Sequence, residues 1–316
     1  MNKRVSIAMA TYNGGRFLRN QLDSLYAQSY PPYEVVVCDD NSQDDTQIVL
    51  EKYHREKGLR YYVNENNLGP TGNFYKAMSL CEGDYVMICD QDDIWLPEKI
   101  EVTLGHMLEI DNGKPSLVSS LAQNIDINGD IIGDRLPDRP DTQGYSHVFV
   151  IDDSAQGCSL MLNKPLLNLV FEFVNNNSRS KDVMYDYFIG MVASLYGNKY
   201  NCGKRLMHYR HHDNNVVAKD RGNRTLTDKV KESNRLVHFQ SDGIFDACAV
   251  GCEVFNRGDE NPEAKSLMHK VAAIGKSNCY LVQMWNLFSI KEIDVIRKMR
   301  IAGENLMVRI VKPFVR

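Results

Sequence analysis

Three carboxylates stand within four positions in Asp90-Gln91-Asp92-Asp93, and they are the residues of this chain best suited to chemistry. They follow the apolar run 85–89, which is typical of a buried strand, and so should lie where that strand ends. Carboxylates this close repel one another unless a cation or hydrogen-bond donors compensate their charge. Hard divalent cations prefer oxygen ligands and often share them with a substrate phosphate. The pattern therefore predicts a Mg²⁺ or Mn²⁺ site that handles phosphate, in preference to an acidic turn that caps the helix predicted at 97–108.

A second acidic pair, Asp39-Asp40, follows the β-branched run 34–38 in the same way. A carboxylate at this edge can accept a hydrogen bond from a base N–H or a ribose hydroxyl. Taken alone, Asp39-Asp40-Asn41-Ser42 could equally be the N-cap of the next helix. Because both acidic segments end a predicted strand, we interpret them together as a nucleotide site.

The segment after the first predicted strand, Thr11-Tyr12-Asn13-Gly14-Gly15, contains neither G-x-G-x-x-G nor G-x-x-x-x-G-K-[ST]. Those glycine-rich loops hold the phosphates in dinucleotide oxidoreductases and in P-loop enzymes. The segment therefore argues against both classes. We expect this protein to hold phosphate through a metal instead of a glycine cradle.

Two downstream segments could complete the site, and each also has an ordinary structural explanation. Asp186 stands at the start of a predicted helix, where a lone aspartate is usually a favourable contact with the helix dipole. The segment Tyr209-Arg210-His211-His212-Asp213-Asn214-Asn215 places a guanidinium beside two imidazoles. That combination can clamp a diphosphate, although histidine pairs are more often surface residues. The residues alone leave both alternatives open.

The first half of the chain alternates strand and helix patterns, with strands predicted at 5–10, 34–38, 60–63 and 85–89. Repeated βα units predict an open α/β sheet, Rossmann-like and mostly parallel, with helices on both faces. Ligands bind such sheets outside the carboxyl ends of the strands, which is where the acidic segments fall. Later predictions are strands at 117–124, 158–162 and 204–208, a hairpin at 125–132, a loop at 135–144, helices at 166–174 and 183–195, and a mainly helical region beyond 217.

Composition and charge restrict the class of protein. With 43% hydrophobic and 25% charged residues, the 316-residue chain can form a core and a soluble surface, which excludes a disordered protein. A net charge of −4 gives no indication of nucleic-acid binding. The eight cysteines are scattered and form no C-x-x-C pair, which favours a reduced, cytoplasmic protein. No apolar run approaches the roughly 20 residues of a membrane span.

The order of these segments resembles glycosyltransferase family 2, the inverting GT-A enzymes. The likeness covers roughly residues 3–217, about two-thirds of the chain. The form Asp-Gln-Asp-Asp-Ile-Trp-Leu-Pro, with a distal Arg-x-His-x-Asn-Asn-Val, is most similar to bacterial rhamnosyltransferase-type members of surface polysaccharide synthesis. The segments that carry the resemblance are Val5–Asn13, Glu34–Ser42, Asn66-Asn67-Leu68-Gly69, Gly83-Asp84-Tyr85, Asp90–Pro97 with Lys99, and Gly157-Cys158.

The resemblance implies a role for each matching residue. Asp186 would be the catalytic base, and a divalent metal (Mg²⁺ or Mn²⁺) would be held by Asp92 or Asp93 together with His212. The residues implied to bind the nucleotide-sugar are Ala10, Thr11, Tyr12, Asn13, Asp40, Asn73, Asp90, Gln91, Asp92 and Arg210. Related members often carry His-Asp-Trp-Trp where this chain has Tyr185-Asp186-Tyr187-Phe188, which leaves acceptor specificity open.

The implied activity is metal-dependent, inverting transfer of a sugar from a nucleoside-diphosphate donor to a hydroxyl of a glycan or lipid-linked acceptor. The donor would be a UDP- or dTDP-sugar, for instance dTDP-rhamnose. We expect a GT-A domain at 1–217, with a nucleotide-sugar-binding half (1–116) and an acceptor-binding half (117–217), and a mainly α-helical extension at 218–316. We do not expect nucleic acid as a partner, and the sequence does not decide whether the protein forms a homodimer.

Residues 290–316 form a basic amphipathic pattern, with Ile290, Ile293, Ile296 and Met299 at near-helical spacing among lysines and arginines. Such a helix can lie on an anionic membrane surface. It can also pack on the catalytic domain or on a second subunit, which is the favoured alternative. We expect a cytoplasmic protein. If this segment binds a membrane, the protein would lie peripherally on the inner face of the cell membrane.

Three other functions are open, and one of them, sugar nucleotidyl transfer, uses the same alternating architecture. A sugar nucleotidyltransferase needs a glycine-rich, basic loop after the first strand to grip a triphosphate, whereas residues 11–16 offer a single arginine. A non-catalytic nucleotide- or carbohydrate-binding module has no need for the intact carboxylate set. A regulatory or scaffold protein is the remaining alternative.

Overall fold

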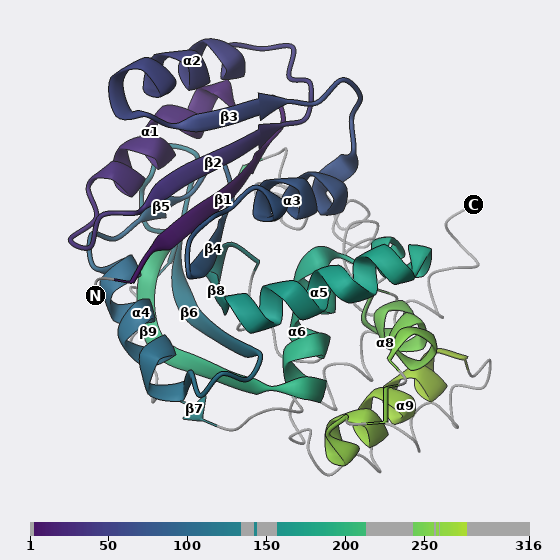
Figure 1. Ribbon diagram of the computed structural model, residues 1–316. Coiled ribbons are helices and arrows are strands. Elements are labelled where there is room, and N and C mark those ends of the chain that lie inside the picture. The colour runs from purple at the N-terminus through teal and green to yellow at the C-terminus, as the bar shows by residue number, and fades with distance from the viewer. Residues whose placement is uncertain are drawn as a thin grey trace.

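The protein, seen here in a computed structural model, is described for residues 3–133, 142–143, 157–212 and 243–276, apart from 256 and 259. In its N-terminal part, apolar β-branched runs alternate with segments of helical periodicity, and each forms the element that its pattern favours. These elements are β1 (Val5–Thr11), α1 (Gly15–Tyr26), β2 (Glu34–Asp39), α2 (Thr46–Lys57), β3 (Arg60–Val63), α3 (Gly69–Ser79) and β4 (Tyr85–Cys89), as Figure 1 shows.

The later part interleaves single strands with helices. It contains two short 3₁₀ turns, η1 and η2, and two helices near the end of the described chain. The elements are β5 (Ile94–Trp95), α4 (Lys99–Ile110), β6 (Ser116–Ile125), β7 (Thr142–Gln143), η1 (Gly157–Ser159), β8 (Leu160–Asn163), α5 (Lys164–Asn176), η2 (Ser178–Asp182), α6 (Tyr185–Tyr196), β9 (Asn198–Arg210), α8 (Gly243–Val254) and α9 (Pro262–Lys276).

The described strands form one mixed sheet in the order β3-β2-β1-β4-β8-β6-β9-β5, with β7 paired to β9. β1 runs parallel to both β2 and β4, so three carboxyl ends meet at one edge. β8 runs antiparallel to β4 and to β6. The predicted α/β fold is therefore confirmed, with a parallel sheet in the N-terminal half and mixed pairing beyond β4.

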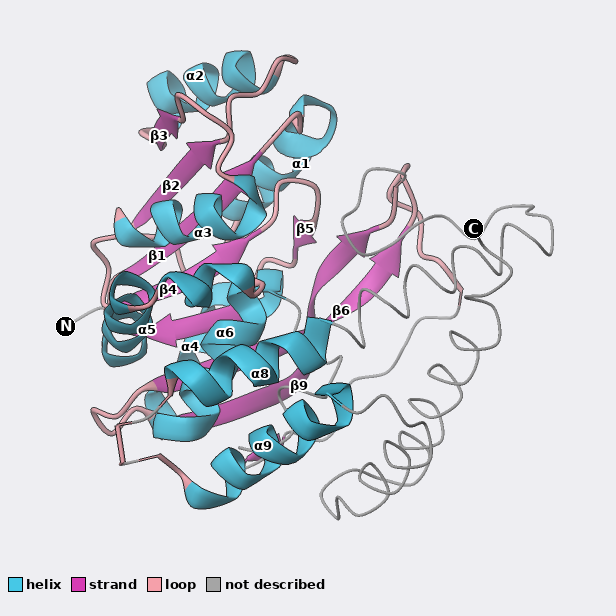
Figure 2. Ribbon diagram, turned by 90° about the vertical axis from the view of Figure 1, so that its right-hand side faces the viewer, coloured by secondary structure: helices cyan, strands magenta, loops and turns pink. Residues whose placement is uncertain are grey.

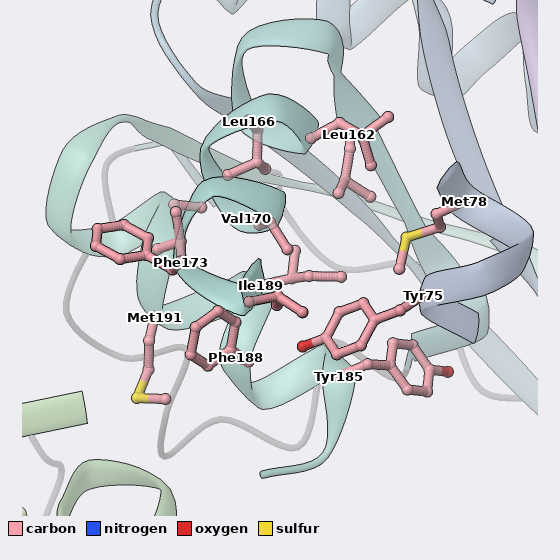
Figure 3. Packing of buried hydrophobic residues seen from close by; sticks show 14 of the residues in the cluster. Tyr75, Met78, Leu162, Leu166, Val170, Phe173, Tyr185, Phe188, Ile189 and Met191 are labelled. Carbon is pink, nitrogen blue, oxygen red and sulfur yellow. The ribbon is translucent and has the colours of Figure 1, made fainter. Parts of the chain in front are cut away.

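Helices cover both faces of the sheet, and each face has its own apolar core (Figures 1 and 2). Successive side chains of a strand point to opposite faces. In β1, Ala8 faces the core under α3, α5 and α6, whereas Ile7 and Met9 face the core under α1, α2 and α4. Figure 3 shows the first of these cores, where Phe188 and Ile189 of α6 pack among side chains of α5 and α3.

The helices α8 and α9 join the same core instead of standing apart from it. Phe255, which follows α8, is 1% exposed, and its ring lies 5.0 Å from that of Phe173 and 5.3 Å from that of Phe188. At Gly251 an added Cβ would lie 2.6 Å from the Met268 sulfur, so the two helices cross closely where α8 has no side chain. Among the described residues, no helix has the length and apolar character needed to cross a bilayer.

Three strands differ from the sequence predictions. The strand predicted at 204–208 is the C-terminal part of β9, which spans Asn198–Arg210 because its polar N-terminal half pairs with β6. β5, which has only two residues, has no strand pattern of its own and exists because it pairs with β9. Of the loop predicted at 135–144, only 142–143 are described, and they form β7. The domain boundary predicted at 217 and the amphipathic segment 290–316 lie outside the described residues.

Candidate active site

The carboxyl ends of β1 and β2 are joined through buried side chains. The Thr11 hydroxyl donates to Asp39 Oδ1 at 2.9 Å, and the same carboxylate accepts the backbone N–H of Ser42 at 3.0 Å. Asp40 N–H donates to the Thr11 carbonyl at 2.8 Å. Ala10, one position earlier in β1, pairs with Cys38 of β2. The two loops that follow these strands are therefore fixed relative to each other.

The end of β4 is fastened to the end of β1 by the Gln91 amide. Tyr12 N–H donates to Gln91 Oε1 at 2.9 Å, and Gln91 Nε2 donates to the Tyr12 carbonyl at 3.2 Å. This contact explains the glycine at position 14, where an added Cβ would lie 2.1 Å from Gln91 Oε1. Asn13 has a positive φ of 48°, and its side chain accepts the Gln43 N–H at 2.8 Å. The Tyr12 side chain is 50% exposed, so an aromatic face is available at this edge.

Asp40 and Asn73, both predicted to contact the nucleotide, are buried and bonded to protein groups. Asp40 accepts hydrogen bonds from Asn64 Nδ2 at 2.7 Å and from the N–H groups of Leu68 and Gly69 at 2.8 and 2.9 Å. Negative charge is favourable there because α3 begins at Gly69. Asn73 Nδ2 donates to the Cys38 carbonyl at 2.9 Å. Both side chains therefore hold the start of α3 against the ends of β1 and β2.

A cluster of two carboxylates and one thiol lies beyond β4. Asp90, Asp93 and Cys158 each place one ligand atom within 4.8 Å of the others. Asp93 is fully buried; its Oδ1 accepts the Arg210 N–H at 3.1 Å, and its Oδ2 has no hydrogen-bond partner among the described residues. Cys158 reaches this position because η1 precedes β8, which pairs with β4.

The charges of this cluster are only partly balanced by nearby protein groups, among them the buried Lys99 ammonium and the Arg210 N–H. Burial, with the charge of Asp92, raises the pKa of Asp90 to about 7. Burial and the charges of Asp92 and Asp90 raise the pKa of Asp93 well above its usual range. A buried carboxylate oxygen without a partner, in a donor set of two carboxylates and a thiol, fits a divalent cation. Of the three predicted ligands, the structure places Asp93 in this cluster.

The other two predicted ligands, Asp92 and His212, contact each other. His212 Nε2 lies 2.7 Å from Asp92 Oδ2, and both side chains are nearly buried. The His212 ring stacks on Phe17 of α1 with 4.9 Å between the ring centres. The pair therefore lies beside the acidic cluster, and the stacking on Phe17 fixes the orientation of the imidazole.

Arg210 was predicted to hold the donor diphosphate, and the structure gives its guanidinium a different set of contacts. Arg210 Nε donates to the Asp92 carbonyl at 2.8 Å, and Nη1 donates to the carbonyls of Asp126 and Ile127 at 3.3 and 3.1 Å. The residue is 1% exposed. These contacts tie the acidic loop (Asp90–Asp93) to the turn after β6.

Asp186 lies in the first turn of α6, half-buried near the acidic cluster. Its carboxylate accepts the Tyr187 N–H at 2.8 Å and a hydrogen bond from the Gly157 backbone. Burial raises the pKa of Asp186 to about 6. The charge of Asp186 also helps to raise the pKa of Asp90, which places the two carboxylates in one electrostatic environment. A carboxylate with this pKa can accept a proton near neutral pH.

Sequence reasoning assigned no role to Cys158, although Gly157-Cys158 was among the segments that carry the family resemblance. A single cysteine before a strand has no ligand spacing, so only the pairing of β8 with β4 places its thiol in the cluster. The buried Lys99, which was also named in the resemblance, was likewise given no role, because only the tertiary structure brings the start of α4 to this cluster.

Solved structures of other proteins share this architecture. The S. aureus TarS fragment 1–349, in complex with UDP-GlcNAc, superposes with a TM-score of 0.57 at 16% identity, over 95% of this chain and 79% of that one. The mannosyltransferase PcManGT from Pyrobaculum calidifontis, in complex with GDP-Man and Mn²⁺, gives 0.53 at 15% identity, over 98% and 87%. The mixed sheet therefore has the GT-A fold of these structures.

The profile described as Glycosyl transferase family 2 matches residues 6–136. This part of the chain is similar to glycosyltransferase family 2, and its relatives are glycosyltransferases. It is 26% identical to the Escherichia coli UDP-Glc:alpha-D-GlcNAc-diphosphoundecaprenol beta-1,3-glucosyltransferase WfgD over 212 residues, 65% of this chain and 76% of that protein. It is 27% identical to the Shigella flexneri dTDP-rhamnosyl transferase RfbG over 219 residues, 66% and 73%.

Proposed function

We propose that this glycosyltransferase moves a sugar from a UDP- or dTDP-sugar to a hydroxyl of a glycan or lipid-linked acceptor, in bacterial surface polysaccharide synthesis. The observation that carries the proposal is Asp186, a half-buried carboxylate with a pKa of about 6 that shares its environment with the acidic cluster beyond β4. The curated relatives WfgD and RfbG use, by their names, a UDP-sugar and a dTDP-sugar.

Asp186 is the general base of this reaction. Its carboxylate is held by the Tyr187 N–H and by the Gly157 backbone, so it has a defined position at the start of α6. It accepts the proton of the acceptor hydroxyl while that oxygen attacks the anomeric carbon from the face opposite the nucleotide. A single displacement inverts the anomeric centre, and no covalent link between sugar and enzyme is required.

The donor lies along the edge formed by β1, β2 and β4. Ala10, Thr11, Tyr12 and Asn13 line the end of β1, and the exposed Tyr12 ring offers a face for a nucleotide base. Asp40, Asn73 and Gln91 keep this edge in shape through their contacts with the backbone.

The acidic loop is the diphosphate end of the donor site. A divalent cation held at Asp90, Asp93 and Cys158, with Asp92 beside them, would supply neutralisation of the charge that develops on the leaving diphosphate. Arg210 keeps the loop in place through the Asp92 carbonyl. His212, oriented by Asp92 and Phe17, lies beside this end of the site.

A donor panel tests the proposal. The protein with Mn²⁺ is incubated with UDP-, dTDP- and GDP-sugars, and release of the nucleoside diphosphate is measured. We expect release from a UDP- or dTDP-sugar, stimulated by an extract that contains lipid-linked saccharide. Formation of a nucleotide-sugar and pyrophosphate from a nucleoside triphosphate and a sugar 1-phosphate would instead identify a nucleotidyltransferase. Binding of a donor with neither hydrolysis nor transfer would identify a binding module.

A further inference from the structure

Lys99 occupies a position that is unfavourable for a lysine. It is the first residue of α4 and is fully buried. A cation at a helix N-terminus faces the positive end of the helix dipole, and burial removes the ammonium from water. Burial accordingly lowers the pKa of Lys99. A group placed at such cost needs compensation from its surroundings.

The ammonium of Lys99 is directed at the turn η1. Nζ donates to the Cys158 carbonyl at 3.0 Å, approaches Met207 Sδ at 3.0 Å, and lies 4.2 Å from the centre of the Trp95 ring. Burial opposes its protonated form, and the carboxylate of Asp93 favours that form. Lys99 in turn acts to lower the pKa of Asp90. The lysine therefore connects the start of α4, the turn η1 and the acidic cluster.

The turn η1 contacts both the acidic cluster and the base Asp186. The Cys158 thiol belongs to the cluster with Asp90 and Asp93. Gly157, one residue earlier, gives a backbone hydrogen bond to the Asp186 carboxylate. Gly157 has no room for a side chain, because an added Cβ would lie 2.1 Å from the Tyr185 hydroxyl. Figure 3 shows that hydroxyl pointing away from the apolar side chains around it.

We propose that Lys99 is a positioning residue for catalysis, because it holds the Cys158 carbonyl and so fixes the peptide that supports the base Asp186 on one side and the acidic cluster on the other. The inference rests on the proposed function, in which Asp186 is the base. In physical terms, one buried cation fixes the position of the acidic cluster after β4 relative to Asp186 of α6.

The test compares Lys99→Met with wild type, and uses Lys57→Met on the exposed end of α2 as a matched control. Methionine keeps the aliphatic stem and removes the charge and the donor; a buried ion replaced by an apolar side chain of similar size usually leaves a protein folded. Lys99→Gln, which keeps a donor but no charge, is the second variant. Thermal unfolding and the Kd for the donor are measured on the same samples.

We expect Lys99→Met to lower kcat by at least about tenfold while the donor Kd changes by less than about threefold. We also expect the acid limb of kcat/KM to move up by about one pH unit, because the loss of the Gly157 hydrogen bond destabilises the Asp186 carboxylate. The pKa of Asp186 is set by burial and backbone donors, and the titratable groups near it are Asp90, Tyr75 and Tyr185. The lysine charge is not among the causes that set the pKa of Asp186, although its loss also raises the pKa of Asp90.

A folded Lys99→Met with unchanged kcat and an unchanged acid limb overturns the inference. Equal losses in donor affinity and kcat, with a lower Tm and no movement of the acid limb, overturn it as well, because they describe a structural lysine only. Asp186→Asn is assayed beside it. If that variant turns over normally, both the base assignment and the inference are wrong; if it is inactive while Lys99→Met is normal, only the inference is wrong.

Discussion

His212 Nε2 lies 2.7 Å from Asp92 Oδ2, although 120 positions separate the two residues in the chain. The short strand β5 explains the contact, because Ile94 of β5 pairs in antiparallel fashion with His208 of β9. The acidic loop precedes β5 and the His212 segment follows β9, so this register brings both to one place. The ring of Phe17 then fixes the imidazole by stacking.

Replacement of Asp186 by asparagine tests the base. The amide keeps the size of the side chain and cannot accept a proton, so transfer should fall by roughly 10²–10⁴-fold while the donor Kd stays near that of wild type. Transfer is measured with saturating donor, and donor affinity by calorimetry. Near-normal turnover in this variant would falsify the assignment.

The pH profile reports the same group. Asp186 has to be ionised to accept a proton, and burial raises its pKa to about 6. We therefore expect kcat/KM to be constant above that pH and to fall about tenfold for each unit below it. An acid limb centred near pH 4, the range of an ordinary aspartate, would assign the base to a different environment.

Removal of divalent metal tests the cluster of Asp90, Asp93 and Cys158. We expect EDTA to abolish transfer and Mg²⁺ or Mn²⁺ to restore it, because the unpaired carboxylate charge needs a cation. Added Mn²⁺ should also raise the Tm of wild type, by mass action on the folded state, and should raise it much less in Asp93→Ala. Full activity of a metal-stripped sample contradicts this role for the cluster.

Gly14→Ala tests the contact between Tyr12 and Gln91. The new Cβ would lie 2.1 Å from Gln91 Oε1, so the amide has to move and both of its bonds to Tyr12 are lost. We expect a loss of about 1–2 kcal/mol in donor binding, which is a 5- to 30-fold higher Kd. Gly105→Ala, at an open position of α4, is the control and should leave the Kd unchanged while it stabilises the helix by about 0.5–1 kcal/mol. Equal affinity of both variants would show that the contact does not matter for the donor.

Deletion of residues 290–316 tests the basic amphipathic segment, which lies outside the described residues. If the segment binds an anionic membrane surface, the truncated protein should leave the membrane fraction and stay soluble at low salt. Fractionation of the truncated protein is compared with that of the full-length Asp186→Asn variant, which keeps residues 290–316. Unchanged fractionation favours packing on the catalytic domain or on a second subunit.

The N-terminal half could be read from the sequence because its signals are local. Buried parallel strands such as Tyr85–Cys89 are continuous apolar runs, and the intervening helices have their own periodicity. The same locality placed Asp40 and Asp90 at strand ends. The polar start of β9 was missed because residues such as Asn198 and Lys199 adopt a strand only through pairing with β6.

By itself, the sequence determined that acidic residues end two parallel strands and that residues 11–15 carry neither glycine-rich phosphate-binding motif, since both follow from residue order. Only the tertiary structure decided how these residues divide their work. It pairs Asp92 with His212, commits Arg210 to backbone carbonyls, and brings Cys158 and Lys99 to the cluster. The reason is that contacts between β4, η1 and β9 depend on sheet order and register, which join residues far apart in the chain and leave no local pattern.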